Sequence, residues 1–282
     1  MHASVGETAG RQPGRVLARR RQELILGEVQ RSGGVRVSEL TDMFGVSDMT
    51  IRRDLDTLSA AGLLEKVHGG ATAVEHRATD EPGFEAKSHR QQGEKRSIAV
   101  AAAKMVQPGT AVGLTAGTTT WQLAGLIVGV PDLVVVTNSI RVAETLHDAQ
   151  RPDLTVVLTG GVRTPSDALV GPVAVNALRS LHVDQVFMGV HGMSERAGFT
   201  TPNLTEAEAN RAFVESAQRL VVLADHTKWG LRALSTITPL AEADVVITDA
   251  GMPSDVREAL RQHVGELVVA PGGPRATRRP LR

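Results

Sequence analysis

The stretch that decides the fold is VSELTDMFGVSDMTIRRDLDTLSAAGLLEKVHGGA, residues 37–71. Ser38 is a candidate N-cap for a short helix. Gly45 is where that helix is expected to end, because a left-handed glycine carries no Cβ penalty. Ser47 is a second candidate N-cap, and it opens a helix predicted over residues 48–61. Two short helices joined by a turn of about four residues predict a helix-turn-helix unit.

The second of these helices is amphipathic. Ile51, Leu55 and Leu58 are spaced four and three residues apart, so they share one buried stripe. The remaining sides offer hydroxyl and guanidinium groups, which suit phosphates and base edges. The candidate DNA contacts here are Ser47, Met49, Thr50, Arg52 and Arg53. An amphipathic helix pair alone would also suit an ordinary helical bundle, but the outward arginine pair and the capped helix start favour DNA.

The flanking segments extend the unit on both sides. Residues 63–71 predict a two-stranded wing with a Gly-Gly tip, and residues 35–37 predict a short strand that pairs with it. A helix is predicted over residues 15–31, and its apolar residues are expected to pack on the other two helices: Leu24, Ile25, Leu26 and Val29. Further candidate DNA contacts are Arg19, Arg20, Arg21, Ser38, Lys66, His68 and Gly69. Taken alone, the three consecutive arginines are better explained as a solvated helix start.

Here the sequence resembles a known family. The run SDMTIRRDL at residues 47–55, followed by HGGA at 68–71, is similar to the N-terminal winged helix of the DeoR/GlpR family of bacterial transcription regulators. That family has a Ser-x-x-Thr-Ile-Arg-Arg-Asp-Leu run and a wing ending in His-Gly-Gly. Lys66 and Val67 stand where the family usually has an arginine, so the positive charge is kept. The resemblance implies a double-stranded DNA operator as partner.

Composition bounds the remaining possibilities. The 282 residues suffice for two ordinary domains, and 41% hydrophobic content with 2% aromatic residues implies an aliphatic core. Absence of cysteine excludes disulfide frameworks, thiolate zinc sites and cysteine nucleophiles, and it fits the cytoplasmic location that we expect. No apolar run approaches about 18 residues, so no membrane span is expected. Net charge is zero, yet residues 11–53 carry nine arginines and five acids, a net of +4.

The chain divides into five predicted segments. These are a disordered start (1–14), a winged helix-turn-helix domain (15–71), a polar linker (72–92), an effector-sensing domain (93–270) and a disordered basic tail (271–282). The tail either adds nonspecific phosphate contacts or is simply solvated.

The second domain alternates short β-branched runs with helical ones. Strands are predicted at residues 111–115, 133–137, 154–159, 184–189, 220–224, 245–248 and 267–269. Helices are predicted at 95–106, 119–128, 140–148, 173–181, 206–217 and 255–263. This alternation predicts an α/β domain with a largely parallel sheet, and thus a two-domain chain that combines an α+β and an α/β fold.

Polar loops follow the predicted strands. Parallel sheets bind small ligands beyond their carboxyl ends, where helix starts favour anions such as phosphate. The loop residues assigned to an effector are Thr115, Ala116, Gly117, Thr118, Thr119, Asn138, Ser139, Gly160, Gly161, Arg163, His191 and Lys228. Each loop alone is better explained by helix capping or turn formation, but several together favour a pocket for a phosphorylated ligand.

This domain also resembles the family's C-terminal sensor. The matching motifs are GTT at 117–119, VTNS at 136–139, TGG at 159–161, FMGVHG at 187–192, GFT at 198–200, Glu206 and DHTKWG at 225–230. The resemblance covers roughly residues 19–250 and implies a fold like that of ribose-5-phosphate isomerase, with phosphorylated sugars as effectors. It adds Glu206 to the effector residues. Many members begin the first loop with Asp-Ser-Gly, whereas this chain has Thr115-Ala116-Gly117, so contacts to ligand hydroxyls should differ.

These observations predict a repressor of carbohydrate-metabolism genes that a phosphorylated sugar releases from DNA. Paired DNA-binding heads imply a homo-oligomer, a dimer or a tetramer. The alternative is a sugar-phosphate isomerase with an accessory DNA-binding module, for which Asp184, Glu206, Asp225 and Lys228 supply acids and bases. Such residues normally serve as caps and ion pairs, so no catalytic residue is assigned and no turnover is expected. The nine histidines form no convincing ligand set, so neither a metal nor a cofactor is expected.

Overall fold

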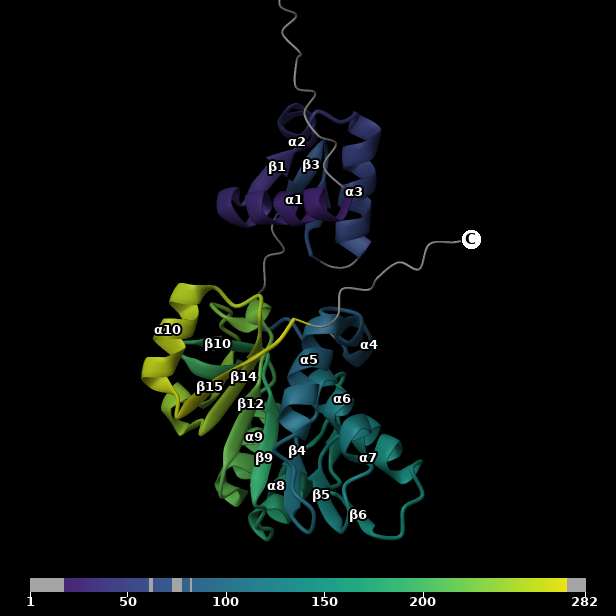
Figure 1. The fold of residues 1–282 in the computed structure, drawn as a ribbon, viewed down its shortest axis with the longest axis vertical. Coiled ribbons are helices and arrows are strands. Elements are labelled where there is room, and N and C mark those ends of the chain that lie inside the picture. Colours follow the sequence, from purple (N-terminus) through teal and green to yellow (C-terminus); the bar gives the residue numbers. More distant parts are fainter. Residues whose placement is uncertain (1–17, 61–62, 73–77, 82, 273–282) are drawn as a thin grey trace, which may run out of the picture. The chain divides into compact units, whose positions relative to one another are not determined.

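The chain forms two compact units, Met1–Glu75 and His76–Arg282. The computed structural model describes residues 18–60, 63–72, 78–81 and 83–272, so the predictions for the chain start (1–14) and for most of the tail (273–282) lie outside the described residues. The boundary between the units falls inside the predicted linker. Each unit is described by itself below (Figure 1).

The first unit is a helix-turn-helix with a small antiparallel sheet. Its elements are α1 (Ala18–Ser32), β1 (Gly34–Arg36), α2 (Val37–Phe44), α3 (Asp48–Ala60), β2 (Glu65–Val67) and β3 (Gly70–Thr72). The strand order β1-β3-β2 confirms both the predicted wing and the predicted pairing of the upstream strand with it. Ile25, Leu40 and Ile51 are fully buried and join the three helices in one core.

The predicted turn between α2 and α3 is confirmed. Gly45 has φ 61°, and its N–H donates to the Thr41 carbonyl at 2.9 Å, which ends α2. The Ser47 hydroxyl accepts the Thr50 N–H at 3.3 Å, which opens α3.

Two local predictions in this unit are wrong. Ser38 does not cap α2, because the helix begins one residue earlier at Val37; instead the Glu39 carboxylate accepts the Arg36 N–H at 3.0 Å. Leu24 does not pack in the core and is 41% exposed, because it lies beside the stripe that Ile25 leads.

The second unit contains a seven-stranded parallel sheet in the order β15-β14-β12-β9-β4-β5-β6. The strands are β4 (Ala111–Leu114), β5 (Leu133–Thr137), β6 (Leu154–Leu158), β9 (Gln185–Gly189), β12 (Leu220–Leu223), β14 (Val245–Asp249) and β15 (Glu266–Ala270). All neighbours in it run parallel, which confirms the predicted α/β architecture. β-branched residues dominate because both faces are covered.

Helices cover the two faces of this sheet (Figure 1). One face packs against α5 (Gln92–Ala103), α6 (Thr118–Ile127) and α7 (Ile140–His147). The other packs against α8 (Pro172–Arg179), α9 (Leu204–Ser216) and α10 (Ser254–His263). Alternate residues of β9 show the division, since Phe187 faces the first group and Val186 the second. Within the described residues, every helix is too short or too polar to traverse a bilayer.

Part of the predicted linker belongs to the folded second unit. Residues Phe84–Ser88 form helix α4, and Phe84 is buried. The Phe84 ring meets the Trp121 ring edge-on at 5.6 Å, and the Arg141 guanidinium lies 5.2 Å from the Phe84 centroid. A helix of five residues is too short to show a periodic pattern in sequence, which explains the difference.

Two small antiparallel sheets were also missed by the sequence analysis. One contains β10 (Gly192–Ser194), β11 (Gly198–Thr201) and β13 (Ser235–Thr238), and the other contains β7 (Val162–Arg163) and β8 (Leu169–Val170). Strands of two to four residues give no measurable alternation. Both small sheets contact α9, and the β7–β8 sheet also contacts α8.

Candidate DNA-binding face and candidate effector site

Helix α3 has one buried side and one exposed side. Ile51, Leu55 and Leu58 are buried, as the sequence predicts. Met49 is 76% exposed, and Arg52 is exposed as well. The outward side of this helix is therefore available to a DNA groove.

The two arginines on that side differ in their contacts. Arg52 Nε donates to Asp48 Oδ1 at 2.5 Å, and this hydrogen bond raises the pKa of Arg52. Arg53 makes no ion pair with the described part of the chain. An exposed pair such as Arg52–Asp48 contributes little to stability, so a phosphate can displace Asp48 at little cost. The Ser47 and Thr50 hydroxyls lie 2.9 Å apart and support each other at the helix start.

The wing presents its turn to solvent. His68 and Gly69 are exposed, and Gly69 has φ 78°. Lys66 is paired with Asp56 of α3, so it holds the wing against this helix in addition to carrying charge. Gly70 is required by packing, because a Cβ there would lie 2.1 Å from the Val35 carbonyl oxygen.

The expected phosphate contact at Arg21 is contradicted by its burial. Arg21 is 6% exposed, and its Nε donates to Asp54 Oδ2 at 2.6 Å. Gln22 donates to the other Asp54 oxygen at 2.8 Å, so this carboxylate joins α1 to α3. Arg20 is exposed, whereas the side chain of Arg19 lies outside the described residues. Ser38 is exposed on α2 and stays a prediction.

The candidate effector site follows from the sheet order. Strands β5 and β6 lie to one side of β4, whereas β9, β12, β14 and β15 lie to the other. The crossovers therefore leave β4 and β9 in opposite directions, and parallel sheets usually bind their ligands beyond the carboxyl ends of such a strand pair. The loops there begin at Thr115 after β4 and at Val190 after β9.

Hydrogen bonds to neighbouring strand ends hold the first of these loops in place. The Thr115 hydroxyl accepts the Gly189 N–H at 3.1 Å, and the Asn138 side chain accepts the Ala116 N–H at 2.9 Å. Asn138 also donates to the Leu169 carbonyl at 3.1 Å and is 1% exposed. These two predicted effector residues therefore shape the loop. Helix α6 starts directly after it at Thr118, where the first amides lack intrahelical partners and favour an anion.

Contacts within the segment itself explain residues of the loop after β6. Gly161 has φ 118°, and a Cβ there would lie 2.4 Å from the Val170 carbonyl oxygen. Arg163 Nη2 lies 2.5 Å from Asp167, which also holds Arg141. Among the described residues, the contacts of Gly161 and Arg163 are with Val170 and Asp167 of the same segment, so the assignment of Gly160, Gly161 and Arg163 to an effector stays a prediction. Ser139 caps α7 by accepting the Val142 N–H at 3.3 Å.

Two lysines that the sequence analysis missed belong to this site. Lys95 of α5 is 4% exposed, and its ammonium donates to the Lys87 and Arg90 carbonyls at 2.5 and 2.6 Å. Burial lowers the pKa of Lys95 to about 8, against the opposing effect of Asp225. The nearby charges of Lys228 and Lys87 lower that pKa further. Two lysine charges near enough to lower the pKa of Lys95 mark a locally positive field.

Lys87 connects this field to a carboxylate. Its ammonium donates to the Ser166 hydroxyl at 2.7 Å, and burial lowers the pKa of Lys87. The Glu206 carboxylate accepts the Thr164 hydroxyl at 2.7 Å, and burial raises the pKa of Glu206 while Lys87 opposes that shift. Cations beside a carboxylate and hydroxyls suit an anionic ligand that carries hydroxyl groups.

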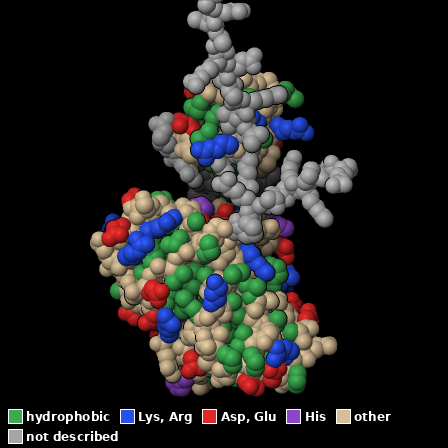
Figure 2. Space-filling model, viewed as in Figure 1, with side chains coloured by type: hydrophobic (Ala, Val, Ile, Leu, Met, Phe, Trp, Pro, Cys, Tyr) green, Lys and Arg blue, Asp and Glu red, His purple; other side chains and the backbone are tan. Residues whose placement is uncertain are grey.

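The remaining residues of this edge come from β9 and β12. Lys228 lies in the short turn His226–Lys228, which begins where the Asp225 carboxylate accepts the Thr227 N–H at 3.1 Å. Within the described residues Lys228 has no ion pair or hydrogen bond of its ammonium group. His191 is half-buried, and its N–H donates to the Thr200 carbonyl at 3.1 Å. Figure 2 shows one face of the molecule, on which basic and acidic side chains of the second unit are intermixed.

Comparison with known proteins gives matches for both units. A DeoR-like helix-turn-helix domain matches residues 21–77, and a DeoR C terminal sensor domain matches residues 90–250. GlpR, a transcriptional regulator of Haloferax volcanii, is 36% identical over 246 residues, 87% of this chain and 95% of that protein. The glycerol-3-phosphate regulon repressor of Escherichia coli is 29% identical over 240 residues, 85% of this chain and 94% of that protein. These similar proteins are transcriptional regulators.

Solved structures show a more distant likeness. A translation initiation factor eIF-2B of Pyrococcus horikoshii aligns with 77% of this chain and 74% of its own, at a TM-score of 0.40 and 14% identity. A ribose-5-phosphate isomerase in complex with phospho-erythronic acid aligns with 48% of this chain and 52% of its own, at a TM-score of 0.36 and 16% identity.

Proposed function

Because this chain belongs to the DeoR family of DNA-binding transcriptional regulators, we propose that it represses carbohydrate-metabolism genes and that a phosphorylated sugar releases it from DNA. The isomerase alternative is set aside, since the similar proteins are regulators. Repression would occur in the cytoplasm, with two or four copies of the chain bound at repeated half-sites.

The observation that carries the DNA half of this proposal is the outward side of α3. Arg53 has no ion pair within the described residues, and Arg52 is bound by an exposed Asp48 that a phosphate can replace. The exposed wing turn at His68 lies on the same small unit and supplies a second contact of the kind winged helices make beside a groove.

The double substitution Arg52→Ala with Arg53→Ala tests it. DNA fragments selected by the wild-type chain from genomic DNA serve as the probe in fluorescence anisotropy. We expect sequence-specific binding to be lost, since each guanidinium contact to a base or phosphate contributes about 1–3 kcal/mol. Arg261→Ala, on exposed α10, is the matched control and should bind like the wild type. Undiminished specific binding by the double variant would contradict the proposal.

The observation that supports a phosphorylated effector is the lysine cluster of the candidate effector site. The charges of Lys87 and Lys228 lower the pKa of Lys95, and the charge of Lys228 also lowers the pKa of Lys87; a dianion stabilises such a cluster of cations. Glu206 with its two hydroxyl donors, Thr164 and Thr201, adds a site for sugar hydroxyl groups. One similar protein is named for glycerol-3-phosphate, which is a phosphorylated small molecule of this kind.

A thermal-shift screen of the full chain tests the effector half. The probes are phosphorylated sugars, their unphosphorylated forms and inorganic phosphate. A ligand at 100 times its Kd stabilises the folded state by about 2.7 kcal/mol, which a melting curve resolves. We expect one phosphorylated sugar to raise the melting temperature while its free sugar does not. A shift of equal size with the free sugar would contradict the role of the lysines.

A further inference from the structure

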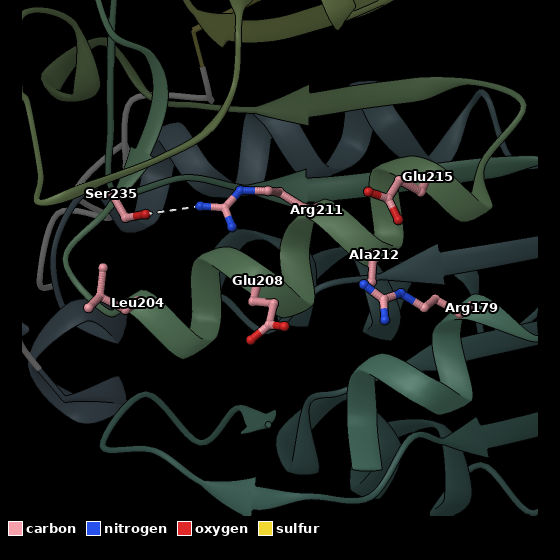
Figure 3. Close-up of a pocket in the computed structure, with 7 residues that line it drawn as sticks. All are labelled: Arg179, Leu204, Glu208, Arg211, Ala212, Glu215 and Ser235. Atoms are coloured by element: carbon pink, nitrogen blue, oxygen red, sulfur yellow. Dashed lines mark hydrogen bonds between the residues drawn. The ribbon is translucent and has the colours of Figure 1, made fainter. Parts of the chain in front are cut away.

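A surface hollow of about 350 Å³ lies on the outer side of α9, between α8 and β13. Figure 3 shows Arg179 approaching it from α8, while Glu208, Arg211 and Glu215 project from successive turns of α9. It is separate in its residues from the candidate effector site, because none of the lysines or loop residues named there lines it.

The four charged groups of this hollow are balanced and unpaired. Arg179, Glu208, Arg211 and Glu215 carry a net charge of zero. Within the described part of the chain, none of them forms an ion pair. The Arg211 guanidinium is nevertheless fixed in place, because it donates to the Ser235 hydroxyl at 3.1 Å and to the Thr236 carbonyl at 3.0 Å. Glutamate and arginine three or four apart on a helix commonly pair, so this arrangement leaves both signs available to something outside the chain.

The order of these groups along α9 is self-complementary. Leu204, Glu208, Arg211 and Glu215 follow one another at spacings of four, three and four residues, which places them in one stripe on the helix. A two-fold axis midway between Glu208 and Arg211 brings an antiparallel copy of the helix against this stripe. Each Glu208 then lies opposite the partner's Arg211, so the favourable pair occurs twice.

An apolar residue at the end of the stripe fits the same arrangement. Leu204 is 63% exposed and lies in the first turn of α9. The same axis places Leu204 opposite the partner's Glu215, whose hydrocarbon stem, with that of the partner's Arg179, can cover it. The charges therefore set the register while the apolar side chains leave water.

We propose that the outer face of α8 and α9 is a two-fold interface with a second copy of this chain, centred between Glu208 and Arg211. This inference rests on the proposed function only in that a repressor acts as an oligomer, and it names the surface through which two copies meet. An isologous contact of this kind would pair two DNA-binding units.

Charge reversal tests the interface in sedimentation equilibrium of the full chain. Glu208→Arg places an arginine opposite the partner's Arg211 on both sides of the axis. Arg211→Glu places a glutamate opposite the partner's Glu208 on both sides. Like charges across an interface oppose association strongly, so we expect each single variant to raise the dimer dissociation constant at least about tenfold. The double variant restores opposite charges at both positions and should associate like the wild type.

The matched control is Glu144→Arg on α7, an exposed position on the opposite face of the sheet. It should leave the association constant unchanged, and unchanged melting temperatures verify that all variants fold. Single variants that associate like the wild type, a double variant that stays dissociated, or a wild-type chain that is monomeric would overturn the proposal. A wild-type melting temperature that no phosphorylated sugar shifts would instead count against the proposed effector. It would leave the interface untouched, since this shift does not require the interface.

Discussion

Burial assigns different roles to arginines that look alike in sequence. Arg21 lies inside the first unit against Asp54, whereas Arg52 and Arg53 lie outside on α3. The Arg21–Asp54 pair joins α1 to α3, so it fixes the helix that carries the proposed DNA contacts. An ion pair removed from water is costly to break, because the remaining charge stays buried without a partner.

This difference predicts the effects of two aspartate substitutions on the same helix. Asp54→Ala removes the buried carboxylate that accepts from Arg21 and Gln22, and should lower the unfolding free energy of the first unit by about 3–5 kcal/mol. Asp56→Ala removes the exposed partner of Lys66 and should cost less than about 1 kcal/mol. Hydrogen–deuterium exchange of α1 and α3 peptides in the full chain measures both. Equal protection in the two variants would contradict the structural role of Arg21.

Lys95 predicts a pH dependence for effector binding. Its pKa is lowered to about 8, so its charge is present at pH 7 and largely lost at pH 9. A sugar phosphate is already dianionic across this range, so affinity should fall as pH rises through 8 because the protein loses a cation. Thermal shifts at pH 7 and pH 9 measure the change. Lys95→Met should abolish the pH dependence, whereas Lys104→Met, an exposed lysine just after α5, should retain it.

At the scale of elements, two glycines predict opposite outcomes. Gly70→Ala places a Cβ 2.1 Å from the Val35 carbonyl oxygen, so β1 and β3 must separate, at a cost of about 1–3 kcal/mol. Gly27→Ala lies within α1 with nothing near its Cβ, and should stabilise the unit by about 0.5–1 kcal/mol. Exchange protection and operator affinity should both fall for Gly70→Ala. Exchange protection of the wing equal to that of the wild type in this variant would contradict the close approach of the strands.

The long elements were predictable because their patterns are continuous. The run at 133–137 coincides with β5, and the buried stripe of α3 follows directly from its spacing. Helix α4 and the small sheets were not predictable, since strands and helices of two to five residues show no period. The order of β4 and β9, which sets the position of the candidate effector site, depends on contacts between residues about 70 apart in sequence.

The missed site residues had a detectable signal. Lys95, Ile98, Ala99 and Ala102 recur on the buried side of α5, so a lysine occupies an apolar stripe. Arg21, Ile25 and Val29 repeat every four residues in the same way. A charge within a helix's apolar period indicates either a buried ion pair or a site, and it is a better guide than a run of consecutive charges.

The whole molecule combines two units with different chemistry. The first unit offers guanidinium groups to DNA, and the second gathers buried ammonium groups at a sheet edge. A ligand changes repression only if it binds the DNA-bound and released forms with different affinities. The proposed two-fold contact on α8 and α9 supplies the second DNA-binding unit whose spacing such a ligand could alter.

The most direct test titrates a phosphorylated sugar, identified by thermal shift, into the full chain bound to a fluorescent DNA fragment that the wild type selects. The account predicts that the sugar phosphate lowers the anisotropy to that of unbound DNA, that its free sugar does not, and that Lys95→Met stays bound. A complex that no phosphorylated sugar dissociates, or a Lys95→Met variant that is released at the wild-type concentration, would contradict it.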